Sequence, residues 1–382
     1  MAVSGGGDSM ALLHLLHRVA PHVGFALHAI TVDHGLRPEA AAEAAGVAAF
    51  CAGLGIPHDT LRWRGPQATG NLMDQARRAR LLLIAQWARA RGIDDVALGH
   101  TADDQAETFL MNLARAAGLD GLCGMRPGWA EHGIRWNRPL WQQTRKGLRD
   151  YLRRNGLAWI DDPSNDDDRF TRVRARRVLK AMKPLGITVE RILASTTHLA
   201  QARGGLQSAL ARLADADVTE QAGALSLPPI GPELERRLLI HAIRWMNGAD
   251  YPPRSEQILR LITALAAGRD ATLGGVQFRR RGERITIIRE PRAVMGPVPF
   301  GGIWDHRWRV EGPAEPAMTI AALGAEGLRR CPGWRDHGPR AALIVSPAVW
   351  HGTDLVAAPL AGEGPGWSAR LEPTFRLFIL AH

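Results

Sequence analysis

Short apolar runs alternate with helical patterns through the first half of the chain. Two of these runs, residues 25–32 and 96–99, predict buried strands. Apolar residues spaced three and four positions apart predict four helices, at 10–19, 39–54, 71–91 and 101–116. Asn71 is the expected cap of the third helix. Because strands and helices alternate, the expected fold class is α/β, a doubly wound parallel sheet with crossover helices on both faces.

The pattern changes after about residue 185. Amphipathic helices are predicted there at 190–216, 233–247 and 255–267, followed by an arginine-rich strand pair at 277–289. These elements predict a smaller, mostly helical second domain that ends in a hairpin. From Pro291 onward the chain is rich in proline and glycine, which fits either a small β domain or an irregular region. We therefore expect three parts, at 1–188, 189–292 and 293–382.

The composition fits a large basic protein. The 382 residues, 46% hydrophobic and 23% charged, can form more than one core. The net charge is +10, and since only Lys146, Lys180 and Lys183 are lysines, 48 − 3 = 45 residues are arginines. Arginine throughout is typical of a GC-rich genome. However, residues 138–183 hold 13 basic and 6 acidic residues, 13 − 6 = 7 of the net charge, and such clustering favours phosphate binding.

Cysteine usage and hydropathy exclude several classes of protein. Cys51, Cys123 and Cys331 stand far apart without a CxxC pair, which argues against a zinc ribbon, a disulfide framework or a thiol relay. No apolar run approaches the roughly 20 residues that span a bilayer, and the first residues do not resemble a signal peptide. We expect a cytoplasmic protein that does not enter a membrane.

The sharpest local signal is a glycine loop that runs directly into the first helix. Its residues are Ser4, Gly5, Gly6, Gly7, Asp8 and Ser9. Glycines let backbone N–H groups approach an anion, and the helix that follows directs its positive end at the same place. The loop lacks the lysine of a GxxxxGK[ST] loop. A flexible linker is the alternative, but a linker would not continue as an apolar helix.

Acidic residues and a histidine follow the second predicted strand. Asp103 and Glu107 are four positions apart and share one helix face, while Asp104 is one step round and His100 ends the strand. Carboxylates beside a phosphate site suit Mg²⁺. Thr101 and Asp104 also form an ordinary capping box, so the residues alone leave both interpretations open.

The loop SGGGDS resembles that of the PP-loop ATP pyrophosphatases. Three further stretches, residues 32–37, 98–108 and 162–165, are similar to the tRNA(Ile)-lysidine synthases within that superfamily. The likeness is close over residues 1 to about 180 and extends in layout only to about 290. It implies that residues 1–188 form a PP-loop ATP-pyrophosphatase domain and that residues 189–292 contact tRNA.

The resemblance also implies an activity. Lysine is ligated to C2 of the wobble cytidine of tRNA(Ile) with a CAU anticodon, through an adenylated cytidine, and pyrophosphate and AMP are released. The implied cofactors are ATP and Mg²⁺, and the implied partners are this tRNA, free L-lysine and a second copy of the chain in a homodimer. An amine with a pKa of about 10.4 is protonated at pH 7, so the reaction needs a base, for which Asp103 and Asp33 are the candidates.

The implied site residues fall into four groups. The catalytic candidates are Asp33, Asp103 and Asp104; the nucleotide-binding candidates are Ser4, Gly5, Gly6, Gly7, Asp8, Ser9, His34 and His100; the metal candidates are Asp103 and Glu107; and the tRNA-binding candidates are Arg172, Arg174, Arg176 and Arg177. Arg77 and Arg80 lie on the long third helix, where a solvated face explains them equally well.

Two features depart from the family pattern. Only Met1, Ala2 and Val3 precede the glycine loop where the family has a full strand, so we expect a mostly missing central strand and a misplaced start codon or a truncated product. Residues 170–173 lack the tyrosine and asparagine that the family usually has at the outer positions, and Leu81 replaces a common aromatic residue.

Two other functions compete with the lysine ligation. A PP-loop thiolase would place sulfur on the same carbon, but such enzymes generally carry paired cysteines. A non-catalytic RNA-binding protein with a decayed nucleotide site would fit the short first strand.

Overall fold

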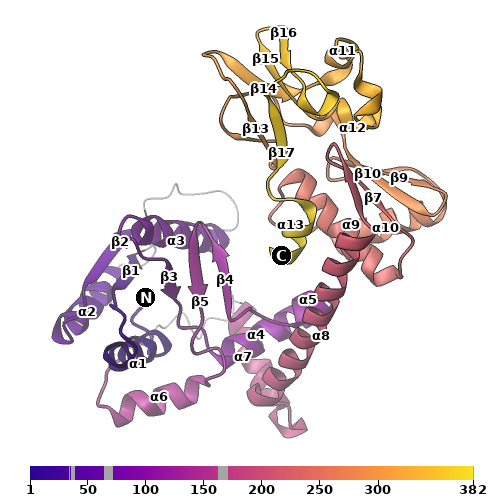
Figure 1. Ribbon diagram of the computed structural model, residues 1–382. Helices are drawn as coiled ribbons and strands as arrows, with labels where there is room; N and C mark the ends of the chain where they lie inside the picture. The colour runs from indigo at the N-terminus through magenta and orange to yellow at the C-terminus, as the bar shows by residue number, and fades with distance from the viewer. Residues whose placement is uncertain (34, 36–38, 64–71, 162–170, 382) are drawn as a thin grey trace. The chain divides into compact units, whose positions relative to one another are not determined.

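The structure is a computed structural model that describes residues 1–33, 35, 39–63, 72–161 and 171–381 (Figure 1). The chain forms two compact units, Met1–Arg203 and Gly204–His382. The predicted cap Asn71, the candidate His34 and the stretch 162–165 lie outside the described residues. None of the helices in the described ranges has the length and hydropathy that a bilayer crossing requires.

Parallel strand pairs form the centre of the first unit. Strand β1 (Ala29–Asp33) runs parallel to β2 (His58–Arg62), and β3 (Asp95–Ala97) runs parallel to β5 (Ile134–Asn137). A short edge strand, β4 (Gly128–Glu131), pairs with β5 in the antiparallel sense. The prediction of a mixed α/β unit with parallel strands is confirmed, although β1 begins four residues later than expected.

The first three residues of the chain lie between the two parallel pairs. The backbone N–H of Val3 donates to the carbonyl of Ile30 (2.8 Å), and that of Ala2 donates to Ala97 (3.0 Å). Ile30 in turn donates to the carbonyl of Met1 (2.9 Å). The strand that we expected to be mostly missing is therefore represented by three residues, which make backbone hydrogen bonds to both neighbours.

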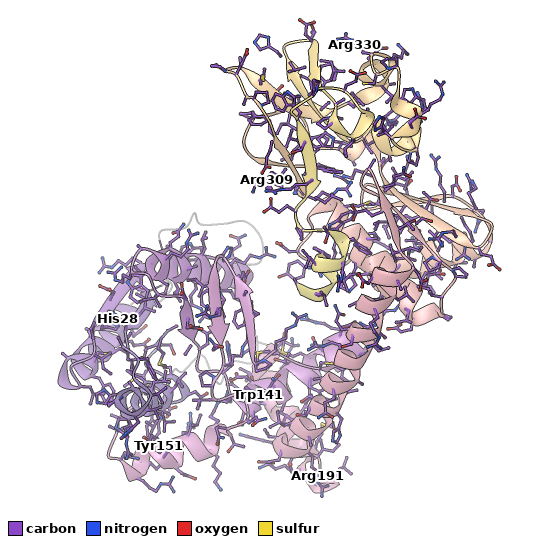
Figure 2. The ribbon with its side chains drawn as sticks, in the orientation of Figure 1. His28, Trp141, Tyr151, Arg191, Arg309 and Arg330 are labelled. Carbon is purple, nitrogen blue, oxygen red and sulfur yellow. The ribbon has the colours of Figure 1, made fainter. Side chains whose placement is uncertain are left out.

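Helices cover both sides of these strands. Alternate residues of a strand face opposite sides, and Ala29 packs with α1 (Gly7–Val23), α2 (Ala40–Gly53) and α6 (Arg145–Arg154). Its neighbour Ile30 packs with α3 (Leu72–Arg89) on the other side. Helices α1 and α6 are further joined by a hydrogen bond between His14 and Tyr151 (2.7 Å), the latter labelled in Figure 2.

Three helices complete the part of the first unit that surrounds the site. Helix α4 (Ala102–Leu113) confirms the helix predicted at 101–116, and α2 and α3 confirm those at 39–54 and 71–91. Helices α5 (Leu119–Leu122) and α7 (Thr171–Met182) were not predicted, nor were α6, β2 and the β4–β5 hairpin. Leu179 of α7 packs against Ala106 and Leu110 of α4, which brings the basic helix beside the acidic one.

Helices and an antiparallel sheet build the second unit. Helix α8 (Val189–Ala216) contains the boundary between the units, and α9 (Pro232–Asn247) and α10 (Ser255–Ala266) lie within the second. The predicted helices and hairpin are confirmed. The expectation of a mostly helical region was incomplete, because the hairpin belongs to a five-stranded sheet of order β6-β7-β10-β9-β8. Its strands are Thr219–Gln221, Ala224–Leu227, Ala271–Leu273, Val276–Arg281 and Arg284–Arg289 in chain order.

The last part of the chain is β-rich, which decides between the two alternatives for it. One sheet has the order β11-β14-β15-β16 and the other β12-β13-β17. Strands β11 to β17 are Val298–Pro299, Ile303–Trp304, Trp308–Glu311, Met318–Ala322, Pro347–His351, Asp354–Ala357 and Ser368–Leu371. Short helices α11 (Gly324–Arg329), α12 (Arg340–Leu343) and α13 (Phe375–Ala381) accompany them. Arg309 of β13, labelled in Figure 2, pairs with Glu372.

Candidate active site

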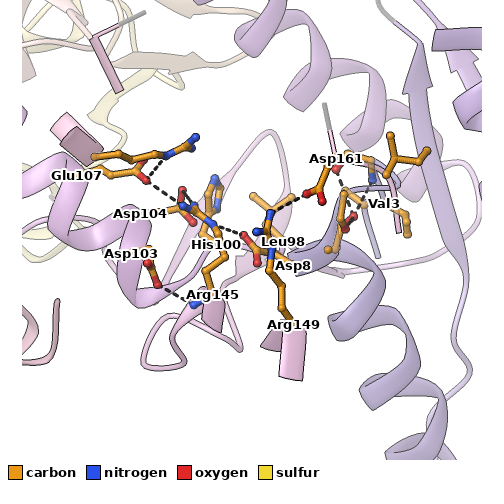
Figure 3. Close-up of a pocket in the computed structure, with 18 of the residues that line it drawn as sticks. Val3, Asp8, Leu98, His100, Asp103, Asp104, Glu107, Arg145, Arg149 and Asp161 are labelled. Carbon is orange, nitrogen blue, oxygen red and sulfur yellow. Dashed lines mark hydrogen bonds and ion pairs between the residues drawn. The ribbon is translucent and has the colours of Figure 1, made fainter. Parts of the chain in front are cut away.

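A cavity of about 1120 Å³ opens in the first unit beside the glycine loop and the ends of β1 and β3 (Figure 3). Most of the residues singled out in the sequence line it: Ser4, Gly6, Gly7, Asp8, Ser9, Asp33, His100, Asp103, Asp104, Glu107, Arg176 and Arg177. Of the other described candidates, Gly5, Arg172 and Arg174 do not line it. All three lysines of the chain, Lys146, Lys180 and Lys183, do.

The glycine loop turns tightly and leaves the start of α1 uncapped. Gly5 has a φ of +81°, and a Cβ there would lie 2.8 Å from Cδ1 of Ile160, so glycine is required at this position. Gly6 is the N-cap of α1 and has no side chain to cap it. The hydroxyl of Ser9 accepts from the N–H of Ser4 (3.2 Å) and donates to the carbonyl of Gly6 (2.9 Å), which holds the turn. Amides at the helix start therefore remain available to an anion.

The acidic helix α4 begins with the capping box that the sequence allowed. Oδ2 of Asp104 accepts from the backbone N–H (2.8 Å) and the hydroxyl (2.9 Å) of Thr101. The other oxygen, Oδ1, accepts from Arg145 (3.3 Å) and Arg172 (3.4 Å). One carboxylate thus both caps the helix and pairs with cations, so the two interpretations of Asp104 are compatible.

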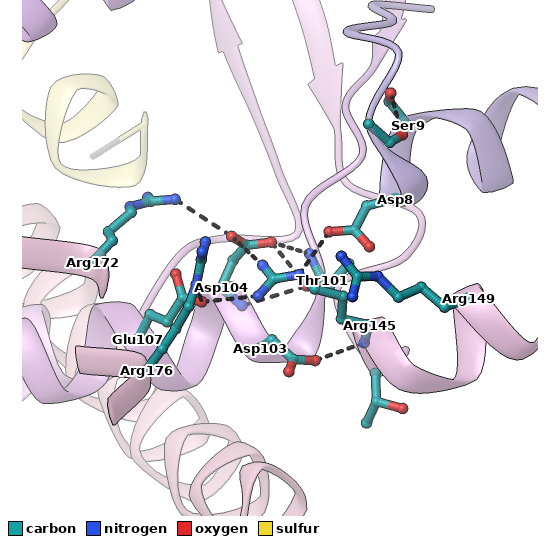
Figure 4. A network of polar contacts seen from close by, with 12 residues as sticks. Asp8, Ser9, Thr101, Asp103, Asp104, Glu107, Arg145, Arg149, Arg172 and Arg176 are labelled. Carbon is teal, nitrogen blue, oxygen red and sulfur yellow. Dashed lines mark hydrogen bonds and ion pairs between the residues drawn. The ribbon is translucent and has the colours of Figure 1, made fainter. Parts of the chain in front are cut away.

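Arg145 is the residue at the centre of the site that sequence reasoning missed (Figure 4). Its guanidinium donates to Asp8 (3.1 Å), Asp104 (3.3 Å) and Glu107 (3.1 Å). Its backbone N–H donates to Asp103 (2.7 Å). In the sequence, Arg145 was only one of many cations in the basic stretch. The available signal was Thr144, which caps α6 by accepting from the N–H of Gly147 (3.2 Å) and so places Arg145 in the first turn.

Glu107 is fully buried and serves two cations. Oε1 accepts from Arg145 (3.1 Å) and from Arg176 (2.6 Å). Oε2 is buried without a hydrogen bond among the described residues. Of the four predicted tRNA-binding arginines, Arg172 and Arg176 thus pair with acidic residues of α4, whereas Arg174 donates to the hydroxyl of Thr171 (3.2 Å).

Burial and the arrangement of charges move several pKa values. Burial raises the pKa of Asp8, and the opposing effect of Arg145 does not cancel it. Burial also acts to raise the pKa of Asp104, but Arg145 and the Thr101 N–H outweigh it and hold that pKa below its usual range. Burial lowers the pKa of His100 to about 3, so this imidazole is neutral at physiological pH.

Asp33 lies at the end of β1 and lines the cavity apart from this network. Its Oδ1 accepts from the N–H of Gly35 (2.8 Å), which is the turn expected after a strand. Within the described ranges, no hydrogen bond or ion pair joins Asp33 to the acidic residues of α4.

The acidic side chains of the cavity include oxygen donors that suit a magnesium ion. No group of three or more His, Cys, Asp or Glu residues in the described ranges could hold a metal alone. Mg²⁺, however, commonly takes one or two carboxylates and completes its octahedron with water and phosphate oxygens. Oδ1 of Asp8 is buried without a hydrogen bond from any described residue, and the charge of Asp103 acts on Asp8. This pair of hard oxygen donors beside a phosphate cradle fits Mg²⁺.

Comparisons with known proteins give consistent results. The PP-loop domain family matches residues 1–182. A tRNA(Ile)-lysidine synthase of Ruegeria pomeroyi is 48% identical over 395 residues, which cover 100% of this chain and 94% of the relative. Proteins of the same name from Hyphomonas neptunium and Rhizobium meliloti are 39% and 36% identical, over 79% and 84% of this chain and 83% and 74% of the relatives.

Proposed function

This chain belongs to the tRNA(Ile)-lysidine synthase family, and we propose that the cavity beside its glycine loop is where ATP, lysine and the wobble cytidine of tRNA(Ile) with a CAU anticodon react. The product is lysidine, and the enzyme is a ligase that forms a carbon–nitrogen bond. One observation carries the proposal: a single cavity contains an uncapped glycine loop and a carboxylate cluster that Arg145 joins to it.

The glycine loop binds the phosphates of ATP in this proposal. The C2 oxygen of cytidine attacks the α-phosphorus, and pyrophosphate leaves. Backbone amides of Gly6 and Gly7 at the start of α1 stabilise the negative charge that develops on the phosphates. Asp8 and Asp103 would hold Mg²⁺, which neutralises phosphate charge when bound. The contacts of Glu107 with two guanidinium groups favour Asp8 over Glu107 as the second ligand.

The second step needs a base, and the carboxylates that line the cavity differ in how well they can take up a proton. The amine of lysine attacks C2 of the adenylated cytidine, AMP leaves, and the amine loses a proton. A carboxylate paired with a guanidinium is a weaker base, which disfavours Asp104 and Glu107. Asp103 pairs instead with a backbone N–H. Because Asp103 is also assigned to Mg²⁺, and a carboxylate bound to that ion is less available to take up a proton, Asp33 outside the network is the first candidate for the base and Asp103 the second.

The basic side of the cavity provides the contact with tRNA. Arg177, Lys180 and Lys183 line it from α7 and the turn that follows, and cations of this kind bind phosphate groups. Arg174 extends the same helix. Arg172 and Arg176 form ion pairs with Asp104 and Glu107, so they would influence the reaction by positioning these carboxylates.

The same family organisation applies to the domains. We propose domain boundaries at residues 188 and 292, and we interpret the two parallel strand pairs, joined by Met1–Val3, as one doubly wound sheet.

Pyrophosphate release tests the proposed function. Purified protein is incubated with ATP and a tRNA(Ile) transcript carrying the CAU anticodon, with and without lysine, and the tRNA is analysed by mass spectrometry of its nucleosides. We expect lysidine and sustained pyrophosphate release only when tRNA and lysine are both present. Without lysine, release should stop at no more than one pyrophosphate per tRNA, because the first step does not consume lysine. A thiolase would be indifferent to lysine, and a non-catalytic RNA-binding protein would release no pyrophosphate; either result would overturn the proposal.

A further inference from the structure

Arg138 is a buried cation whose partner is a histidine and not an acid. Only 6% of its surface is exposed. Its Nε donates to Nδ1 of His100 (3.0 Å), and one terminal nitrogen donates to the carbonyl of Arg126 (2.5 Å). Its guanidinium carbon lies 4.1 Å from the ring centre of Trp129. In the described ranges no ion pair joins Arg138 to a carboxylate, and a guanidinium buried in this way is costly to folding.

The hydrogen bond between Arg138 and His100 fixes the tautomer of the imidazole. A guanidinium N–H can only donate, so Nδ1 of His100 must accept and cannot carry a proton. A neutral imidazole has one N–H group, which is therefore on Nε2. Protonation of the ring would place an N–H at Nδ1 directly against the N–H of Arg138.

Burial and most of the surrounding charges favour the same neutral form. Burial of the ring has the largest effect on its pKa and lowers it. Among the described groups that act on His100, Asp104 of α4 favours the charged ring, whereas Arg138 after β5, Arg80 of α3 and Arg172 of α7 oppose it. Burial and the three cations together outweigh this carboxylate, so the imidazole is uncharged.

The Nε2–H group of His100 has no hydrogen-bond acceptor within the described part of the chain, although the ring lines the cavity. The loop that carries it lies close to the glycine loop, since a Cβ on Gly99 would lie 3.1 Å from Cα of Ser9. We propose that Arg138 holds His100 as a permanently neutral donor, whose Nε2–H binds a phosphate oxygen of ATP and takes no part in proton transfer. The identity of this ligand rests on the proposed function; the tautomer does not.

The tautomer is tested by nitrogen-15 NMR of the histidine rings in the full chain between pH 5 and 8. The signal of His100 is assigned by its loss in H100Q. We expect a single Nε2–H tautomer that does not titrate. In Arg138→Met, which keeps the apolar contact with Trp129 but donates nothing, the ring should titrate in this range or show both tautomers. A wild-type ring that is charged at pH 7, or protonated at Nδ1, would overturn the proposal.

The donor role is tested by ATP affinity, measured by calorimetry. A hydrogen bond to a charged group is worth roughly a tenfold change or more, so H100L, which cannot donate, should weaken ATP binding about tenfold. H100Q, which has an amide N–H, should stay within about threefold of the wild type. His14→Leu is the control, because His14 bonds to Tyr151 and does not line the cavity. Equal affinity of H100L and the wild type would overturn the donor role, whereas failure of the wild type to bind ATP would overturn the proposed function and the ligand assignment together.

Discussion

Arg145 and Asp8 meet at 3.1 Å between Nε and Oδ2, although 137 positions separate them in the chain. Arg145 begins α6, and Asp8 lies in the first turn of α1. The same guanidinium reaches Glu107, whose side chain is fully buried on α4. One cation therefore fixes the phosphate loop relative to the acidic helix, and the geometry of the site depends on it.

Arg145→Met should remove both stability and activity. Asp8, Asp104 and Glu107 would lose a shared cation, and breaking a buried pair in this way costs about 3 kcal/mol. We expect the free energy of unfolding in urea to fall by about that amount. Pyrophosphate release should fall at least about a hundredfold, because the glycine loop and the carboxylates of α4 lose the guanidinium that holds them together. Arg154→Met is the matched control on the same helix. Arg154 is exposed and does not line the cavity, so its loss should cost less than about 1 kcal/mol. Equal losses in the two variants would contradict the role of Arg145.

Asp8→Asn should be more stable than the wild type at neutral pH and bind ATP more weakly. Burial raises the folded-state pKa of Asp8 above its unfolded value of about 3.9, so the ionised carboxylate destabilises the folded protein. This cost is fully present above the folded pKa, decreases as the pH falls through it, and vanishes below about pH 3.9. The extra stability of the variant should follow the same course in urea titrations at a series of pH values. A variant less stable than the wild type at pH 7 would show that the pair with Arg145 outweighs burial.

Features determined within a few residues could be predicted from the sequence. The glycine loop and the capping box of Thr101 and Asp104 each form between residues at most five positions apart. The residue types at these positions are therefore enough to predict both motifs. The strands β4 and β5 were missed because each has only four residues. The sequence feature that could have indicated them is the pair His132 and Gly133 between Trp129 and Trp136. In the structure both turn residues have positive φ, and the two tryptophan rings stack across the hairpin.

The partners of the cations could not be predicted in the same way. Arg172 and Arg176 are predicted to bind tRNA, and the packing of α7 against α4 also gives them Asp104 and Glu107 as partners. The sequence shows a basic helix and an acidic helix without showing that they are neighbours. Neither charge nor periodicity distinguishes a cation that faces a partner helix from one that faces solvent.

Gly5→Ala should destabilise the loop, whereas Gly46→Ala should not. An alanine at a φ of +81° is strained, and its Cβ would lie 2.8 Å from Ile160, so we expect a loss of about 2 kcal/mol in the free energy of unfolding. ATP affinity should fall with it. Gly46 lies exposed within α2 with nothing near its Cβ position, and alanine there should add about 0.5–1 kcal/mol. A Gly5→Ala variant with unchanged stability and ATP affinity would contradict the described loop.

Asp103→Asn should raise the Mg²⁺ concentration that pyrophosphate release requires. If Asp103 and Asp8 hold the ion, loss of one carboxylate should shift the half-maximal Mg²⁺ concentration about tenfold or more upward, and EDTA should abolish release by either protein. Asp33→Asn is the control, because Asp33 lines the same cavity outside the network. The control can change the rate but should keep the Mg²⁺ dependence of the wild type. An identical Mg²⁺ dependence in all three proteins would exclude Asp103 as a ligand.

Replacing Lys180 and Lys183 with alanine should weaken tRNA binding and reduce its dependence on salt. Each phosphate contact contributes about 0.7–0.9 to the slope of log affinity against log salt concentration, because binding releases a condensed counterion. The double variant should therefore lose about 1.5 from the magnitude of the slope, measured with tRNA(Ile) by filter binding over a range of potassium chloride concentrations. Arg89→Ala, which removes an exposed cation in the last turn of α3, should keep the slope. An unchanged slope in the double variant would show that the tRNA backbone does not contact this side of the cavity, while an equal loss in Arg89→Ala would indicate a general effect of net charge.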